Sequence, residues 1–345
     1  MIEVSNLTKR YGAHTAVSDL SFKIEKGRIY GFLGPNGAGK STTMNIITGC
    51  LAATGGKVAI GGYDIFDEPI KAKKLIGYLP ELPPLYTDMT PGEYLKFVAR
   101  AKGLTGAEVK KQVESAIATT HLEDVKQRLI KNLSKGYKQR VGIAQALLGN
   151  PEVIILDEPT VGLDPKQIIE IRALIKDLGR EHTVILSSHI LSEVNAICDE
   201  IIIISGGKLV AADTPDNLTR LFAGSSRITV RARCQKEALN KALEGLGEIK
   251  SLTDDGELST AEVEFEADYP NPSEEIFTAC VKSGLTLNEL KMEHASLEDV
   301  FLELTSGDNA ESSENTAEAE PETDEPEAIE PEANEPEADE GGENK

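Results

Sequence analysis

The spacing of apolar side chains changes character several times along the chain. Between residues 1 and 220, short β-branched runs alternate with stretches in which apolar residues recur every three to four positions. The runs that predict strands cover 29–33, 153–156, 184–187 and 201–205, and the helical patterns cover 39–50, 91–102, 135–148 and 165–178. This alternation predicts an α/β layer with a largely parallel sheet.

Two stretches depart from this alternation. The early runs 2–8, 16–24 and 56–60 follow one another closely without helices between them, which indicates an antiparallel section beside the parallel sheet. Between about residues 81 and 150 the pattern is mostly helical. We therefore expect an inserted helical subdomain over about 81–150.

The pattern restarts after residues 224–226. A strand is predicted at 227–234, a helix at 236–246, strands at 248–252 and 261–267, a helix at 272–283, a strand at 285–292 and a last helix at 296–305. The first six elements have the β-α-β-β-α-β order of ferredoxin-like domains. The expected domains are therefore 1–223, a small α+β domain over 224–306, and a tail over 307–345.

Charge sets the tail apart from the rest of the chain. The 345 residues carry a net charge of −22, and 307–345 hold 16 acids and one lysine, which leaves −7 for residues 1–306. From residue 325 a five-residue repeat places a proline in every copy, which blocks a helix and leaves little to bury. We expect a disordered, solvating tail; a docking segment for a basic partner surface is the alternative.

Composition excludes several classes of protein. No apolar run reaches eighteen residues, and the first residues lack the basic and apolar regions of a signal peptide, so a cytoplasmic location is expected. No basic stripe is present, which argues against a nucleic-acid partner. The four cysteines, Cys50, Cys198, Cys234 and Cys280, are far apart and predict buried reduced thiols rather than a metal site or disulfides.

A glycine-rich loop follows the predicted strand 29–33 and opens a helix. It matches the pattern GxxxxGK[ST] in full, with Gly34, Pro35, Asn36, Gly37, Ala38, Gly39, Lys40 and Ser41. Backbone N–H groups of such a loop point at phosphate oxygens, and the helix N-terminus adds a partial positive charge. Lys40 is expected to reach the β- and γ-phosphates of ATP, and Ser41 to bind Mg²⁺.

Two further strand ends carry reactive side chains. Asp157 and Glu158 end the apolar strand 153–156, and carboxyl ends of parallel strands meet at the edge of the sheet where ligands bind. Asp157 can hold Mg²⁺ and Glu158 can act as general base on the attacking water. His189 follows strand 184–187 and could contact the γ-phosphate, whereas the other histidines, His14, His121, His182 and His294, fit no constellation.

Ser134 precedes a helical run that begins with Lys135, Gly136 and Tyr137. Alone this is an N-cap, but a helix N-terminus with a free serine hydroxyl is also an anion site. Because it falls in the helical insertion, it could complete an ATP site in trans, on a second subunit.

Taken together, these residues resemble the nucleotide-binding subunit of an ABC transporter, over about residues 2–220. The resemblance identifies Walker A at 34–41, Walker B at 153–157, Glu158 as the catalytic glutamate, Asp164 as the D-loop aspartate and His189 as the switch histidine. It implies a P-loop NTPase core, with Tyr11 stacking on adenine and Thr42 joining the nucleotide-binding set. Ser134 and Gly136 would face the phosphates of a partner's ATP.

Two departures from the family pattern resemble its ABC-2 exporter subgroup, including the gliding-motility-type ATPases. The signature LSGGQ reads here with Lys135 and Tyr137 in place of a glycine and the glutamine, and the Q-loop glutamine is Glu81. A carboxylate at 81 could still contact the metal. Lys135 would add positive charge near the γ-phosphate if it points that way.

The resemblance implies an ATP-hydrolysing subunit that dimerises around two Mg-ATP, as homodimer or heterodimer. It would drive a separate membrane permease, for export, from the cytoplasmic face of a bacterial membrane, with coupling through residues 81–89. Two alternatives remain open: a soluble ABC ATPase acting on ribosomes or DNA, and a regulator that binds ATP without turnover.

Overall fold

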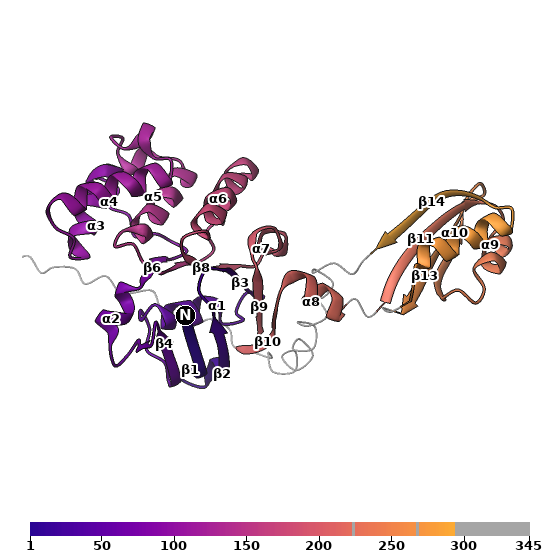
Figure 1. Cartoon of the computed structure of the whole chain (residues 1–345), viewed down its shortest axis with the longest axis horizontal. Helices are drawn as coiled ribbons and strands as arrows, with labels where there is room; N and C mark the ends of the chain where they lie inside the picture. The colour runs from indigo at the N-terminus through magenta and orange to yellow at the C-terminus, as the bar shows by residue number, and fades with distance from the viewer. Residues whose placement is uncertain (223–224, 267–268, 294–345) are drawn as a thin grey trace, which may run out of the picture. The chain divides into compact units, whose positions relative to one another are not determined.

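Two sheets and the helices around them build the part of the chain that carries the motifs. The structure, a computed structural model, describes residues 1–222, 225–266 and 269–293. The smaller sheet is antiparallel, in the order β2-β1-β4-β5, and holds β1 (Ile2–Tyr11), β2 (His14–Ile24), β4 (Gly55–Ile60) and β5 (Tyr63–Asp64). This confirms the antiparallel section predicted for the start of the chain (Figure 1).

The larger sheet runs in the order β10-β9-β3-β8-β7-β6. Its members are β3 (Ile29–Leu33), β6 (Ile76–Leu79), β7 (Val153–Leu156), β8 (Thr183–Ser188), β9 (Glu200–Ser205) and β10 (Lys208–Asp213). All neighbours in it pair in parallel except β10, which is antiparallel to β9. The largely parallel sheet is thus confirmed, and β3, which precedes the glycine-rich loop, lies inside it.

Alternate residues of these strands face two cores. Tyr30, Phe32 and Ile155 pack with the antiparallel sheet and with α1 (Lys40–Ile47). Ile154 and Leu186, from the opposite face, pack with α6 (Pro165–Leu178) and α7 (Leu191–Ile197). Strands buried on both faces read as continuous apolar runs, which is why they stand out in the sequence.

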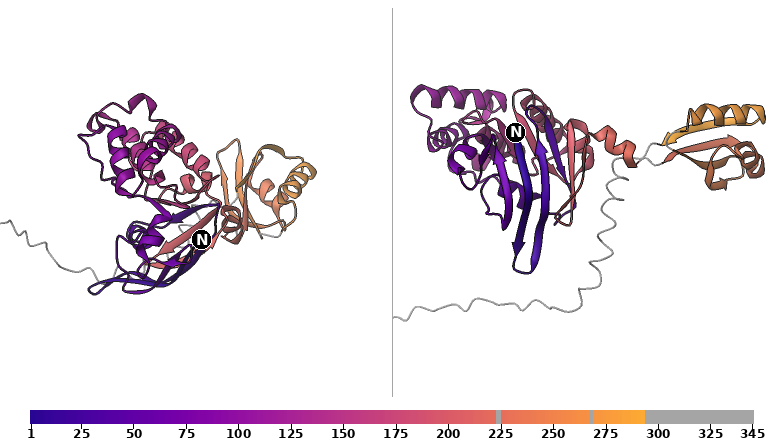
Figure 2. Two further views of the ribbon diagram at one scale, coloured as in Figure 1. Left: turned by 60° about the vertical axis from the view of Figure 1, so that its left-hand side comes forward. Right: turned by 60° about the horizontal axis from the view of Figure 1, so that its bottom comes forward.

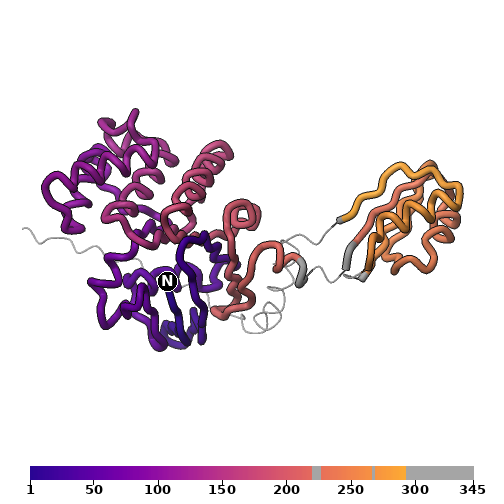
Figure 3. Tube along the Cα trace, viewed as in Figure 1, coloured from indigo at the N-terminus to yellow at the C-terminus, as the bar shows by residue number. Residues whose placement is uncertain are grey.

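The chain between β6 and β7 is largely helical, as expected, and its helices are the purple ones in Figures 2 and 3. It contains α3 (Pro91–Ala101), α4 (Gly106–Thr119), short 3₁₀ turns at Glu123–Val125 and Ile130–Asn132, and α5 (Lys135–Leu147). These helices share a core of their own that includes Leu95, Val113 and Val141. The remaining helices of this part are α2 (Pro69–Lys74) and α8 (Pro215–Phe222).

Residues 225–293 form a sheet with helices and have their own apolar cluster. Along the chain come β11 (Ser225–Arg233), α9 (Lys236–Leu243), β12 (Glu248–Asp254), β13 (Ser259–Glu266), α10 (Pro272–Lys282) and β14 (Thr286–Glu293), with sheet order β12-β13-β11-β14. The predicted helix 296–305 and the tail 307–345 lie outside the described residues. The division of the chain into domains stays a prediction.

The expected ends of the elements in residues 1–220 differ from the structure by at most three residues. The largest shift at a helix end is in α1, which stops at Ile47 rather than at Cys50 because Gly49 takes a left-handed φ of 68°. Cys50 is exposed and Cys234 is half-buried, which corrects the expectation of buried thiols at these two positions, whereas Cys198 and Cys280 are buried. All four cysteines are free.

Candidate active site

The glycine-rich loop joins the end of β3 to the start of α1. Gly37 and Gly39 have φ values of 82° and 96°, in the left-handed region that side chains avoid. A Cβ on Gly39 would also lie 2.5 Å from the carbonyl oxygen of Ala16 on β2. Both the turn and this close approach require glycine here, so the loop can wrap tightly before the helix begins.

Lys40 is the first residue of α1 and its side chain is buried. Its ammonium donates to the carbonyl oxygens of Gly34 at 2.7 Å and Pro35 at 3.1 Å. Burial lowers the pKa of Lys40, and the carboxylates of Glu158, Asp157 and Glu81 act in the opposite direction. The Lys40 ammonium is thus held by carbonyl oxygens of the loop, within the electrostatic range of three carboxylates.

Strand register brings the other motif residues to the same edge of the sheet. Leu33 at the end of β3 pairs with Ser188 on β8, and Leu156 at the end of β7 pairs with Leu186. The residues that follow these strands are therefore neighbours. The sequence predicted that the residues at these strand ends lie close together, and the strand pairing shows which positions are neighbours.

Asp157 is almost fully buried beneath the loop. The Ser41 hydroxyl lies 3.4 Å from its Oδ1, and the Ser187 hydroxyl donates to the same oxygen at 2.5 Å. Ser187 also accepts from the backbone N–H of Glu158 at 2.9 Å. Sequence reasoning missed Ser187, although a hydroxyl at the end of a strand beside the Asp157 strand was a usable signal.

Glu158 and His189 form a hydrogen-bonded pair. His189 Nδ1 lies 3.0 Å from Glu158 Oε2, and the Glu158 side chain is largely buried. Glu158 has a left-handed φ of 47°, a conformation that is unfavourable for a residue with a side chain. Backbone strain of this kind persists only where surrounding contacts enforce it.

A hollow of about 470 Å³ opens over the loop. It gathers most of the predicted site residues, namely Tyr11, Asn36, Gly37, Gly39, Lys40, Ser41, Thr42, Glu81, Glu158 and His189. His14, Ala16 and Val161 line it too. The sequence analysis placed His14 in no candidate site. It comes directly after the β1–β2 turn and pairs with Tyr11 across the hairpin, which brings it to the edge of this hollow.

Five further predicted residues, Gly34, Pro35, Ala38, Asp157 and Asp164, do not line this hollow. Gly34 and Pro35 hold Lys40, and Ala38 and Asp157 are buried. Asp164 caps α6, where its carboxylate accepts from the Gln167 N–H at 2.9 Å.

Ser134 and Gly136 lie in a different hollow. Ser134 caps α5 and accepts from the Tyr137 N–H at 3.4 Å. Both residues line a second cavity of about 450 Å³ together with Gln167, and that cavity shares no lining residue with the one over the loop. Lys135 lies along Gly162, where a Cβ would collide with its ammonium. Its side chain therefore packs on the segment that follows Glu158 in the same chain.

The site residues fit a nucleotide better than a metal cluster. Within residues 1–222, 225–266 and 269–293, no group of three His, Cys, Asp or Glu could hold a metal by itself. Mg²⁺ usually takes one or two protein oxygens and completes its shell with phosphates and water. The neighbouring oxygens of Ser41 and Asp157 suit that mode of binding.

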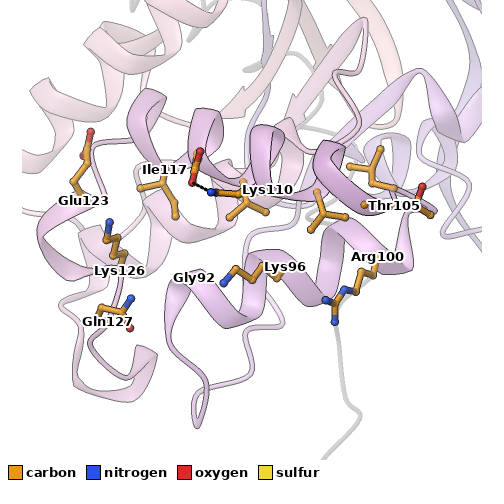
Figure 4. Close-up of a pocket in the computed structure, with 14 residues that line it drawn as sticks. Gly92, Lys96, Arg100, Thr105, Lys110, Ile117, Glu123, Lys126 and Gln127 are labelled. Carbon is orange, nitrogen blue, oxygen red and sulfur yellow. Dashed lines mark ion pairs between the residues drawn. The ribbon is translucent and has the colours of Figure 1, made fainter.

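A third hollow, a groove of about 820 Å³, lies between α3 and α4 (Figure 4). Leu104, Val109, Val113 and Ile117 contribute apolar side chains to it. Its charged lining residues are Lys96, Arg100, Lys110, Lys126, Glu114 and Glu123, so cations outnumber acids there. None of its lining residues belongs to the motifs.

Comparison with known proteins identifies the family. The model of the family described as "ABC transporter" matches residues 17–161. The linearmycin resistance ATP-binding protein LnrL of Bacillus subtilis is 35% identical over 311 residues, which cover 88% of this chain and 98% of that protein. The chain belongs to the ATP-binding subunits of ABC transporters.

Other members and their structures agree with this assignment. The bacitracin transport ATP-binding protein BcrA of Bacillus licheniformis is 34% identical over 89% of this chain and 98% of its own. The dimeric ATP-binding cassette MJ0796, in a post-hydrolysis state with ADP and Pi, has a TM-score of 0.57 and 28% identity over 62% of this chain and 98% of its own. The protein is thus the ATP-binding and ATP-hydrolysing subunit of an ABC transporter.

Subunits of this family dimerise and work with membrane permeases. In the described part of this chain, no helix combines the length and apolar character needed to cross a bilayer. The soluble ATPase and the non-hydrolysing regulator, which the sequence had left open, are not favoured by these relatives.

Proposed function

We propose that two copies of this ABC subunit close over two Mg-ATP, each site being shared between them. Lys40, Ser41, Asp157, Glu158 and His189 of one copy would face Ser134 and Gly136 of the other. The observation that carries this is the separation of the two hollows, because no lining residue of one belongs to the other. This separation supports a site in which Ser134 and Gly136 are supplied by a second chain.

The chemistry follows from the contacts in the hollow. Ser41 and Asp157 would hold Mg²⁺, with Glu81 close by, and the ion would supply positive charge to the phosphates. Glu158 would orient and deprotonate the attacking water. Its hydrogen bond to His189 Nδ1 holds the imidazole in place and leaves Nε2 for the γ-phosphate.

Tyr11 would hold the adenine. Its ring is half exposed at the edge of the hollow, with the Lys9 ammonium 5.1 Å from the ring centroid. A cation over one face leaves an aromatic surface suited to stacking against a base. Gly34 to Gly39 and Thr42 would surround the phosphates through backbone N–H groups.

The substrate is proposed from the relatives. This chain resembles ATP-binding proteins whose names refer to linearmycin resistance, bacitracin transport and lantibiotic transport. We infer that this subunit powers export of an antimicrobial compound, at the cytoplasmic face of a bacterial membrane. No nucleic-acid partner is proposed, because residues 1–306 carry a net charge of −7.

We propose that the permease contacts the helical subdomain of this chain. Leu82, Tyr86 and Phe97 are exposed apolar side chains, and Tyr86 packs on Phe97 with ring centroids 5.3 Å apart. Phe97 belongs to α3, which also lines the groove of Figure 4. A cytoplasmic segment of the permease with apolar and acidic side chains would fit the apolar and basic lining of this groove.

The Glu158→Gln variant tests the shared site. The amide removes the base and keeps the size of the side chain, so ATP should still bind while turnover is lost. Light scattering after size exclusion should then show a dimer in Mg-ATP and a monomer without nucleotide.

Adding Lys40→Ala to this variant is the matched control, because it should remove nucleotide affinity and with it the dimer. A Glu158→Gln protein that stays monomeric at saturating Mg-ATP would contradict the shared site. Turnover at the wild-type rate would contradict the role of Glu158.

A further inference from the structure

A buried carboxylate lies next to the Glu158–His189 pair without lining the hollow. Glu193 belongs to α7, which begins two residues after His189, and its side chain is 2% exposed. Burying a carboxylate is costly unless hydrogen bonds or a cation compensate it. Its contacts therefore indicate what the residue does.

Glu193 bonds to both segments that carry the reactive pair. Its Oε2 accepts from the Thr160 hydroxyl at 2.5 Å and from the Ser188 hydroxyl at 3.2 Å. Thr160 comes two residues after Glu158, and Ser188 comes directly before His189. One carboxylate oxygen thus joins the two loops.

The other oxygen of Glu193 faces α6. Arg172 NH2 lies 3.6 Å from Oε1, an ion pair that is too long for a hydrogen bond. Among the described residues, Glu193 Oε1 and Arg172 Nε are the buried side-chain polar atoms without a hydrogen-bond partner. α6 begins after Asp164, so Arg172 ties a third motif segment to the same carboxylate.

The contacts bracket the strained residue. Glu158 holds its left-handed φ of 47° between two anchors. On the N-terminal side, the Glu158 N–H donates to the Ser187 hydroxyl. On the C-terminal side, the Thr160 hydroxyl donates to Glu193 Oε2. Removal of the second anchor would let the Glu158 backbone relax toward an ordinary conformation and move its carboxylate away from His189.

We propose that Glu193 is a positioning residue for ATP hydrolysis, acting through Thr160 and Ser188 to hold Glu158 against His189. This rests on the proposed roles of Glu158 and His189. Because neither Thr160 nor Glu193 lines the hollow, the role concerns turnover and leaves nucleotide binding alone.

The test compares Thr160→Val with Thr160→Ser. Valine keeps the shape and removes the hydroxyl, whereas serine keeps the hydroxyl. Thr160→Val should lower kcat about 10- to 100-fold, since misplacement of a catalytic group by about 1 Å can cost 100-fold. The Kd for ATP should stay unchanged, and Thr160→Ser should restore most of kcat.

Glu193→Gln extends the test to the carboxylate. If both residues act through one bond, Thr160→Val and Glu193→Gln together should lower kcat no more than the stronger single change. Additive losses would show that they act separately and would overturn the proposal. So would a Thr160→Val protein with wild-type kcat, or one whose Kd rises in step with the fall in kcat.

Glu158→Gln, measured alongside, separates this inference from the proposed function. Loss of turnover in Glu158→Gln with normal turnover in Thr160→Val would remove only the role of Glu193. Normal turnover in Glu158→Gln would remove the assigned base itself.

Discussion

At the scale of single residues, Lys135 and Gly162 connect two motifs that are 27 positions apart in the sequence. Lys135 stands where the family signature has glycine, and the ammonium was expected to approach a phosphate if it pointed that way. In the structure the side chain lies along Gly162, which has a left-handed φ of 68°. The bare Cα of Gly162 provides the space that the lysine occupies.

Gly162→Ala should weaken the ATP-dependent dimer of the Glu158→Gln protein. A Cβ would displace Lys135, and a side chain in the left-handed region costs about 1–2 kcal/mol. Gly162 does not line the hollow over the loop, so ATP should still bind each chain. Light scattering across a range of protein concentrations would measure the shift.

Gly103→Ala is the matched control, because Gly103 has a φ of 87° and open space around it. It carries a similar backbone cost without displacing a neighbour. Equal dimerisation in the two variants would show that Lys135 packing has no part in closure.

At the scale of elements, Arg140 joins the signature helix α5 to two other segments. Its guanidinium lies 2.7 Å from Glu170 Oε2 on α6 and donates to the Thr120 carbonyl oxygen at 3.1 Å. Arg140 is 9% exposed and Thr120 is fully buried. The arginine thus satisfies a carbonyl that water cannot reach, and it ties α5 to the helix that follows Asp164.

Arg140→Met should lower the free energy of unfolding by about 1–3 kcal/mol, because the buried Thr120 carbonyl loses its donor. Urea denaturation followed by circular dichroism would measure this. Lys110→Met is the control: its 4.0 Å pair with Glu114 is exposed, and such pairs contribute about 1 kcal/mol or less. Equal losses would mean that the Arg140 contacts contribute no more than a surface pair.

The elements themselves were largely predictable, whereas their contacts were not. β7 and α6 were predicted with their observed ends, because a buried apolar run and a proline-started helix are strong local signals. Motif spacing likewise predicted Lys40, Asp157 and Glu158 as site residues, and their roles stay a prediction. The sequence analysis did not predict Ser187 and Glu193 as site residues, because their hydrogen-bond partners depend on strand register and helix packing, which local sequence does not encode.

At the scale of the whole molecule, most of the negative charge lies outside the motifs. The residues that line the hollow over the loop fall between Tyr11 and His189, whereas 307–345 contribute −15 of the net −22. In the proposed dimer two such chains would come together, and like charges oppose association. The acidic segment is therefore expected to affect dimer affinity more than the chemistry of a single site.

Removal of 307–345 should leave ATPase activity close to that of the full chain and strengthen the ATP-dependent dimer of Glu158→Gln at low salt. Charge repulsion is the reason, so the difference should shrink as salt rises: the screening length is about 30 Å at 0.01 M and about 3 Å at 1 M. Dimer dissociation constants at both salt concentrations would test this. A large loss of ATPase activity would give the tail a role in the site, and a salt-independent difference would exclude charge as its cause.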